Sequence, residues 1–175
     1  MQKPCALLDF DDCRRLGVLL HEEARHYRRL LRLAVRQNSY MQRQDVDRLA
    51  SNAREWATYL PRADAARIAR ERLLNRLAGA RDLSGPAASV EGLLEHTDLT
   101  ARPAVINALR EVRHAAARLA RQNEQNRILA EFCLDLAREE TEIFKRVVLE
   151  DPTGCYDDGA RNTERGPGGV IVRQA

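Results

Sequence analysis

The sequence predicts an all-α protein: an antiparallel hairpin or bundle of long helices with coiled-coil-like packing, followed by a disordered C-terminal tail. Aromatic residues make up only 5% of the 175 residues, and leucine, alanine, arginine and glutamate dominate, a composition typical of long packed helices. Glycine and proline cluster in two segments, residues 79–103 and 152–169. We therefore expect a helical domain over residues 1–150 and a flexible tail over residues 151–175.

The first helix is predicted over about residues 10–42. Mostly apolar side chains recur there at steps of three and four residues, which places them on one face of a helix. This stripe consists of Leu16, Leu20, Glu23, Tyr27, Leu30, Leu31 and Ala34. Charged residues occupy the other faces, so the stripe is expected to pack against a second helix.

The second helix is predicted over about residues 45–79, with Asp45 as its N-cap. Its expected inward positions are Val46, Leu49, Ala53, Trp56, Leu60, Ala66, Ala69, Leu73 and Leu77. Pro61 lies within this run, and a proline inside a helix removes one backbone hydrogen bond and clashes with the preceding turn. The sequence therefore predicts a break at Pro61, either a kink or a restart with Leu60 ending the first segment.

A third long helix is predicted over about residues 103–149, after a short helical piece near Val90–Glu95. Pro103 suits its first turn, and a heptad pattern then continues without interruption. We call the inward-facing heptad positions the seam; its expected members are Val105, Leu109, Val112, Ala116, Leu119, Asn123, Asn126, Ala130, Cys133, Ala137, Glu140, Phe144 and Val147. At about 70 Å this helix is longer than the first two, at about 50 Å each, so about four turns would extend beyond an antiparallel bundle.

Two asparagines, Asn123 and Asn126, occupy consecutive positions of this expected seam. A polar residue at such a position lowers stability but sets the register, because its amide needs a polar partner across the interface. The alternative is that the helix is exposed to solvent at this point. We favour the register-setting role, and both interpretations stay open.

A second apolar strip begins after Asn126 and runs beside the seam. Its candidate partner-binding residues are Ile128, Leu129, Phe132, Leu136, Ile143, Phe144 and Val147. Exposed apolar patches usually mark partner surfaces, so this strip is a candidate binding site. The alternatives are that the tail covers it or that two copies of the chain associate through it.

The sequence gives no support for catalysis, a metal or a cofactor. It contains no Gly-rich phosphate loop before a helix and no nucleophile elbow. Two Glu-x-x-His motifs, at residues 23–26 and 111–114, have the spacing of bundle di-iron sites. A rotation of about 100° per residue turns Glu111 and His114 away from the seam, and the second helix supplies no inward glutamate. Cysteines 5, 13, 133 and 155 lack the spacing of a zinc site, so reduced thiols are expected.

Charge and hydropathy indicate neither a nucleic-acid partner nor membrane insertion. The formal net charge is +3, and arginines 25, 28, 29, 32 and 36 are interspersed with apolar residues and lack an aromatic ladder. A solvated helix face accounts for them better than a phosphate-binding stripe. No run of 18 apolar residues exists and acids lie near the N-terminus, which predicts a cytoplasmic protein without membrane insertion.

Three segments together resemble the FlgN family of flagellar export chaperones. They are "LARQNEQNRIL" (Leu119 to Leu129), the apolar helix that follows it, and "YDDG" (Tyr156 to Gly159) in the Gly-rich tail. The opening of the second helix, "MQRQDVDRLA", is also similar to that family. The resemblance implies a two-helix hairpin, a long third helix with an Asn-x-x-Asn motif, and a flexible tail carrying a tyrosine.

The resemblance also implies a function. It indicates a cytoplasmic, non-enzymatic chaperone that holds the hook-associated proteins FlgK and FlgL before type III export. The C-terminal part of the third helix would bind a terminal segment of the client, which agrees with the apolar strip found above. Tyr156 matches the tail tyrosine linked to a membrane component of the export gate. The alternative function is a structural coiled coil that self-associates through the same strip.

Overall fold

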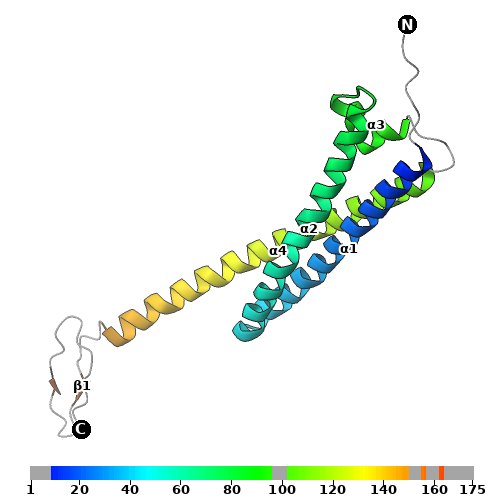
Figure 1. The fold of residues 1–175 in the computed structure, drawn as a ribbon. Coiled ribbons are helices and arrows are strands. Elements are labelled where there is room, and N and C mark those ends of the chain that lie inside the picture. Colours follow the sequence, from blue (N-terminus) through cyan, green and yellow to red (C-terminus); the bar gives the residue numbers. More distant parts are fainter. Residues whose placement is uncertain (1–8, 96–101, 150–154, 157–161, 164–175) are drawn as a thin grey trace. The chain divides into compact units, whose positions relative to one another are not determined.

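The computed structural model describes residues 9–95, 102–149, 155–156 and 162–163, with side chains over residues 9–95 and 102–147 (Figure 1). The helices are α1 (Phe10–Gln42), α2 (Val46–Gly79), the 3-10 helix η1 (Gly85–Ala88), α3 (Val90–Glu95) and α4 (Arg102–Leu149). Two short antiparallel strands follow, β1 (Cys155–Tyr156) and β2 (Asn162–Thr163). The predicted all-α class, with long helices that pack against one another, is confirmed. Apart from β1 and β2, the expected disordered tail lies outside the described residues.

The chain divides into two compact units, Met1–Leu129 and Ala130–Ala175. The division falls within α4. The predicted domain boundary after residue 150 lies outside the described residues. Unit one contains the hairpin of α1 and α2, the short helices η1 and α3, and the first part of α4. Unit two contains the remainder of α4 and the strand pair.

Side-chain caps fix where the two hairpin helices begin. The Oδ1 atom of Asp9 accepts a hydrogen bond from the Asp12 backbone N–H at 2.7 Å and so caps α1. Asp45 caps α2 in the same way, through the Arg48 backbone N–H at 3.1 Å, which confirms its predicted role. Between the helices Gln44 adopts a left-handed backbone with φ of 54°, and this tight turn reverses the chain.

Helix α2 continues through Pro61, so the predicted restart after Leu60 is wrong. The proline ring faces solvent, and the residue whose carbonyl loses its helical donor, Ala57, is exposed as well. Water can therefore bond to that carbonyl. Residues Ala63 and Ala66, one turn further on, are buried against the neighbouring helices and hold the chain in helical conformation.

The inward face of α2 differs from the predicted one in its first half. Val46 and Leu60 are exposed, whereas Asn52 is buried and Tyr59 half-buried. The observed positions alternate four and three residues across Pro61 without a break: Asn52, Trp56, Tyr59, Ala63, Ala66, Arg70, Leu73 and Leu77. Because some of these inward residues are polar, the apolar pattern of the sequence did not show which positions of α2 face inward.

Within unit one, the first part of α4 runs parallel to α1 and antiparallel to α2. Its early residue Val105 packs in one cluster with Cys13 and Leu16, while Asn126 bonds to Ala34 near the end of α1. The observed seam of α4 in unit one consists of the buried or half-buried residues Val105, Ala108, Val112, Ala115, Leu119, Gln122 and Asn126. Every second predicted position was therefore displaced by one residue, with Leu109, Ala116 and Asn123 predicted in place of Ala108, Ala115 and Gln122.

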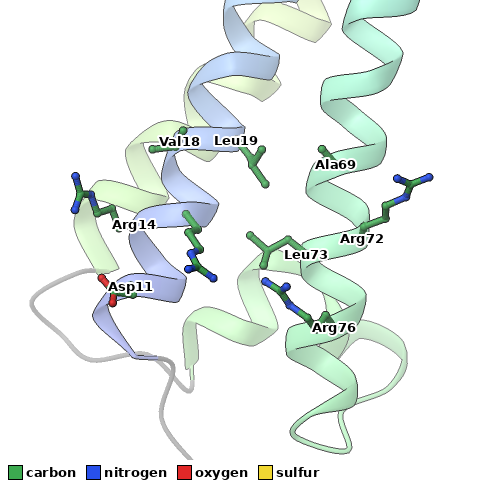
Figure 2. A pocket seen from close by; sticks show the side chains of 9 residues that line it. Asp11, Arg14, Val18, Leu19, Ala69, Arg72, Leu73 and Arg76 are labelled. Carbon is green, nitrogen blue, oxygen red and sulfur yellow. The ribbon is translucent and has the colours of Figure 1, made fainter.

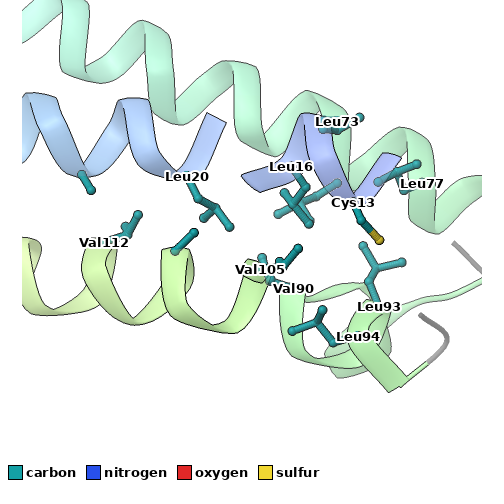
Figure 3. Packing of buried hydrophobic residues seen from close by; sticks show 13 residues of the cluster. Cys13, Leu16, Leu20, Leu73, Leu77, Val90, Leu93, Leu94, Val105 and Val112 are labelled. Atoms are coloured by element: carbon teal, nitrogen blue, oxygen red, sulfur yellow. The ribbon is translucent and has the colours of Figure 1, made fainter. Parts of the chain in front are cut away.

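The main core of unit one lies where α3 closes the open end of the hairpin. Leu16 and Leu20 of α1, Leu77 of α2, Leu93 of α3 and Val105 of α4 meet there, all buried (Figure 3). A second, smaller cluster around Leu30, Leu33 and Ala63 continues the core along the hairpin. The two clusters give unit one its apolar interior.

Helix α3 can approach η1 closely because residue 92 is glycine. A Cβ atom at this position would lie 2.5 Å from both the Cα and the carbonyl oxygen of Ala87, closer than any side-chain carbon can approach backbone atoms. Gly92 is itself buried. A glycine is therefore required for Leu93 and Leu94, its buried neighbours in α3, to enter the core.

Candidate partner-binding site

Asn126 of α4 is buried where this helix packs on α1. Its side chain is 5% exposed, and its amide nitrogen donates to the Ala34 carbonyl oxygen at 2.8 Å and to Gln37 Oε1 at 3.2 Å. Its Oδ1 atom accepts from Asn38 Nδ2 at 3.0 Å and from Gln122 Nε2 at 3.1 Å. A primary amide has two donor hydrogens and two acceptor lone pairs, so every polar group of this side chain is satisfied.

The two asparagines of the motif have different surroundings. Asn123 is exposed, while Asn126 is buried in the interface with α1. The seam position next to Asn126 belongs to Gln122, which is half-buried and bonds to the same oxygen atom. Asn123 is therefore exposed to solvent, as the alternative interpretation expected. Of the two asparagines, only Asn126 remains a candidate for setting the register.

Exposed apolar side chains dominate α4 after this point. We call the set the client strip, defined as Ile128, Leu129, Phe132, Leu136, Ile143, Phe144 and Val147. Leu129 is half-buried and the other six are exposed, with Phe132 at 64% and Val147 at 67%. Over residues 130–147 every side chain is exposed except that of Cys133, which is half-buried. The described residues of the chain therefore leave the strip accessible.

The strip continues the seam that packs on α1. The same alternation of three and four residues, taken onward from Asn126, reaches Leu129, Cys133, Leu136, Glu140, Ile143 and Val147. Phe132 and Phe144 are each adjacent in sequence to one of these positions and widen the apolar face. Leu134 is a further exposed apolar residue that the sequence did not single out, and it lies off the seam.

Local ion pairs support the helix in unit two. Asp135 pairs with Arg138 at 3.2 Å, and Glu142 pairs with Lys145 at 2.8 Å, both at a spacing of three residues. The Lys145 hydrogen bond holds the pKa of the Glu142 carboxyl below its ordinary value, and Glu142 in turn raises the pKa of Lys145. Such exposed pairs add little stability, because solvent screens the charges. They leave the client strip uncovered.

Glu23, which the sequence placed on the stripe of α1, is held by an ion pair in the core of unit one. Its side chain is 1% exposed and accepts from Arg70 Nε at 2.5 Å and from the Tyr27 hydroxyl at 3.0 Å. Burial, and next the neighbouring Glu23 charge, raise the pKa of Tyr27 to about 12. This cluster ties α1 to α2 and has a structural role.

The glutamates of both Glu-x-x-His motifs bind arginine. Glu23 binds Arg70, and Glu111 accepts from Arg28 Nη2 at 2.6 Å, which lowers the pKa of the Glu111 carboxyl. Among the side chains that the structure describes, no group of three His, Cys, Asp or Glu residues is placed to hold a metal ion.

Tyr156, the residue linked by resemblance to the export gate, lies in β1. Its backbone pairs with Asn162 in β2, and Cys155 pairs with Thr163. The side chain of Tyr156 is outside the described residues. Of the helices described, none is long and apolar enough to cross a membrane.

The described residues define an all-α protein of long helices, in which one helix packs in a hairpin core and then exposes an apolar face. The chain belongs to the FlgN family: the model of the FlgN protein family matches residues 14–164. This match covers most of the chain and makes it a flagellar export chaperone in general terms, one of a family that binds flagellar proteins. Neither a search of curated proteins nor a search of solved structures returned a significant match.

Proposed function

We propose that the client strip binds the amphipathic terminal segment of hook-associated proteins, FlgK and FlgL, before flagellar type III export. The observation that carries this proposal is the continuation of the α4 seam past Asn126 as exposed apolar residues. In unit one the same seam is packed against α1. A client helix that docks on residues 129–147 makes the kind of contact with α4 that α1 makes on residues 105–126, which is helix-in-groove recognition.

The charge on the strip indicates what the client supplies. Glu140 occupies a seam position between Leu136 and Ile143, and within the described part of the chain it makes no hydrogen bond or ion pair. A carboxylate that is enclosed in an interface without a partner costs binding free energy. The client segment is therefore expected to place an arginine or lysine opposite Glu140, between apolar residues that meet Leu136 and Ile143.

The proposal further assigns Tyr156 to the export gate. The resemblance links the tail tyrosine to a membrane component of that gate, and Tyr156 lies beyond the client strip in the chain. Tyr156→Ala should retain client binding and reduce binding to the gate component. Loss of client binding in this variant would contradict the division of roles. The chaperone acts in the cytoplasm, without catalysis or a cofactor.

The client strip can be tested with Phe132→Asp combined with Leu136→Asp. We expect this variant to lose co-purification with FlgK or FlgL, because two carboxylates would face the apolar client helix, while circular dichroism keeps its helix content. The matched control is Leu134→Asp, an exposed leucine on the same helix but off the seam. It should bind the client normally. Retained binding in the double variant, or equal loss in the control, would rule out the strip.

Self-association through the same strip is a second candidate function, because exposed apolar seams also pair with copies of themselves. A parallel pair in register would bring Glu140 of one chain next to Glu140 of the other, and like charges at facing seam positions oppose that pairing. Sedimentation of the free protein at several concentrations separates the candidates. A client-binding monomer keeps one sedimentation coefficient, whereas a self-associating coiled coil sediments faster as concentration rises.

A further inference from the structure

A groove between α1 and α2 lies apart from the client strip. Its volume is about 700 Å³, and all its lining residues come from α1 and α2, none from α3 or α4. Leu19 of α1 and Leu73 of α2 point toward one another across it, and Arg76 lies nearby on α2 (Figure 2). Val18 adds an apolar side chain that is largely exposed. The groove thus combines an apolar floor with a polar edge.

The edge of the groove is strongly basic. Four arginines line it, Arg14, Arg15, Arg72 and Arg76, against the single acid Asp11. None of these guanidinium groups makes a hydrogen bond or an ion pair with another described residue. Several other arginines of the hairpin are paired, as Arg70 is with Glu23. The groove therefore concentrates positive charge that the described residues do not neutralise.

We infer that this groove binds an acidic amphipathic helical segment of another protein. Two antiparallel helices that leave an apolar groove between them accept a third helix, whose apolar side chains fill the groove while its polar flanks meet the edges. Carboxylates on those flanks pair with the four arginines, and leucine-like side chains meet Val18, Leu19 and Leu73. No aromatic residue lines the groove to stack on a base, which favours a peptide over a nucleic acid.

The inference can be tested on the full chain with a labelled probe peptide. The probe is an amphipathic helix with leucine at positions i, i+3, i+4 and i+7 and glutamate at the flanks, and a second probe carries glutamine in place of glutamate. Fluorescence anisotropy at low salt should show the glutamate probe binding about tenfold more tightly, since several exposed charge pairs of a few tenths of a kcal/mol add up to that ratio. Equal binding of both probes would overturn the inference.

Charge reversal locates the site. Arg15→Glu with Arg76→Glu should weaken the glutamate probe by about tenfold or more. The matched control is Arg118→Glu with Arg121→Glu, two exposed arginines of α4 that change the net charge equally and do not line the groove. It should keep the affinity within about threefold, because long-range charge effects on exposed groups are screened. Equal weakening by both pairs would overturn the inference, since whole-chain charge would then explain binding.

Two further measurements separate this site from other occupants. The Phe132→Asp, Leu136→Asp variant should bind the glutamate probe as the unmodified chain does. Probe binding to the groove is therefore tested independently of the proposed client strip. Loss of probe binding in that variant would place the peptide on α4 and overturn the inference. A single-stranded oligonucleotide that bound more tightly than the probe, and was released by the Arg15 and Arg76 reversals, would make the groove a nucleic-acid site instead.

Discussion

The two parts of α4 have the same heptad pattern and opposite surroundings. From Val105 to Asn126 every seam residue is buried or half-buried against the rest of unit one, whereas from Ala130 to Val147 all side chains but Cys133 are exposed. Apolar residues occupy the seam in both parts, so helix composition does not cause the difference. What differs is whether the described chain supplies a second helix. A heptad therefore shows where a helix can pack, and the partner can belong to another molecule.

Polar residues on the two parts of the seam sharpen the comparison. Asn126 in the covered part has a partner for each donor and acceptor of its amide. Glu140 in the open part has no described partner. Glu140 is exposed to solvent, so its carboxylate would require such a partner only if another chain buried it.

The largest expected loss of stability comes from breaking the ion pair between Glu23 and Arg70 in unit one. Arg70→Met leaves the Glu23 carboxylate buried without its cation, which should lower the free energy of unfolding by about 3–5 kcal/mol. Arg72→Met, an exposed arginine two residues away, should change it by less than about 0.5 kcal/mol. Urea denaturation measures both. Equal stability of the two variants would show that Glu23 does not depend on Arg70.

The contrast between the two parts can be measured by truncating one side chain in each region. Leu33→Ala creates a cavity at a fully buried position and should cost about 2–5 kcal/mol of unfolding free energy. Phe132→Ala removes a larger but exposed side chain and should cost less than about 0.5 kcal/mol. A comparable loss in the free protein for Phe132→Ala would mean that the client strip is covered in solution.

The close approach of α3 to η1 gives a third prediction. Gly92→Ala inserts a carbon 2.5 Å from the Ala87 backbone, and the forced shift should cost about 1–3 kcal/mol. Gly79→Ala is the matched control, because a Cβ there meets nothing within 4 Å. It should leave the thermal midpoint unchanged or raise it. If Gly92→Ala melted at the temperature of the unmodified chain, the packing of α3 on η1 would need revision.

The boundary between the two parts depends on Asn126. Asn126→Ala removes four hydrogen bonds and leaves half-buried partners unsatisfied, which should cost about 1–3 kcal/mol. Asn123→Ala changes an exposed side chain and should cost less than about 0.5 kcal/mol. Chemical denaturation of the pair tests which asparagine sets the packing. If Asn123→Ala lowered the free energy of unfolding more than Asn126→Ala, then Asn123 and not Asn126 would be the residue that packs in the seam.

The last prediction is a pH dependence of stability that comes from Tyr27. Its pKa is about 12 in the folded protein and near 10.0 when unfolded, so the unfolded state loses this proton first as pH rises. The stability that Tyr27 contributes is therefore present below pH 10 and is lost by about pH 12. Tyr27→Phe should show a shallower decline in unfolding free energy across this range. Identical slopes for the two proteins would contradict the raised pKa.

Sequence periodicity predicted the helices well and the phase of their inward faces less well. In α4 the positions of Val105, Val112 and Leu119 were placed correctly, but the intervening ones were displaced by one residue. Ala108 and Leu109 are neighbours and both apolar, as are Ala115 and Ala116, so the pattern alone cannot distinguish them. In the structure Ala108 and Ala115 are buried, whereas Leu109 and Ala116 are half-buried.

The polar residues on the inward faces could not be predicted from the sequence pattern for a different reason. Asn52 of α2 is buried because its side chain donates to the Leu33 carbonyl oxygen of α1. Arg70 lies on the same face because it meets Glu23. Each partner belongs to another helix, so one helix read by itself shows only a polar residue in an apolar position. The exposure of the apolar side chains in the client strip, by contrast, could be anticipated from helix lengths alone, and its role in binding stays a prediction.

The helix in unit two is held by contacts three and four residues apart, such as the pairs of Asp135 with Arg138 and Glu142 with Lys145. An unsupported helix of this length is only marginally stable in water, and its helical fraction falls as temperature rises. Warming therefore removes the face that a partner would recognise before the hairpin core melts. Docking a partner has the opposite effect, since it adds the burial that this segment lacks, and the bound segment should melt together with the core.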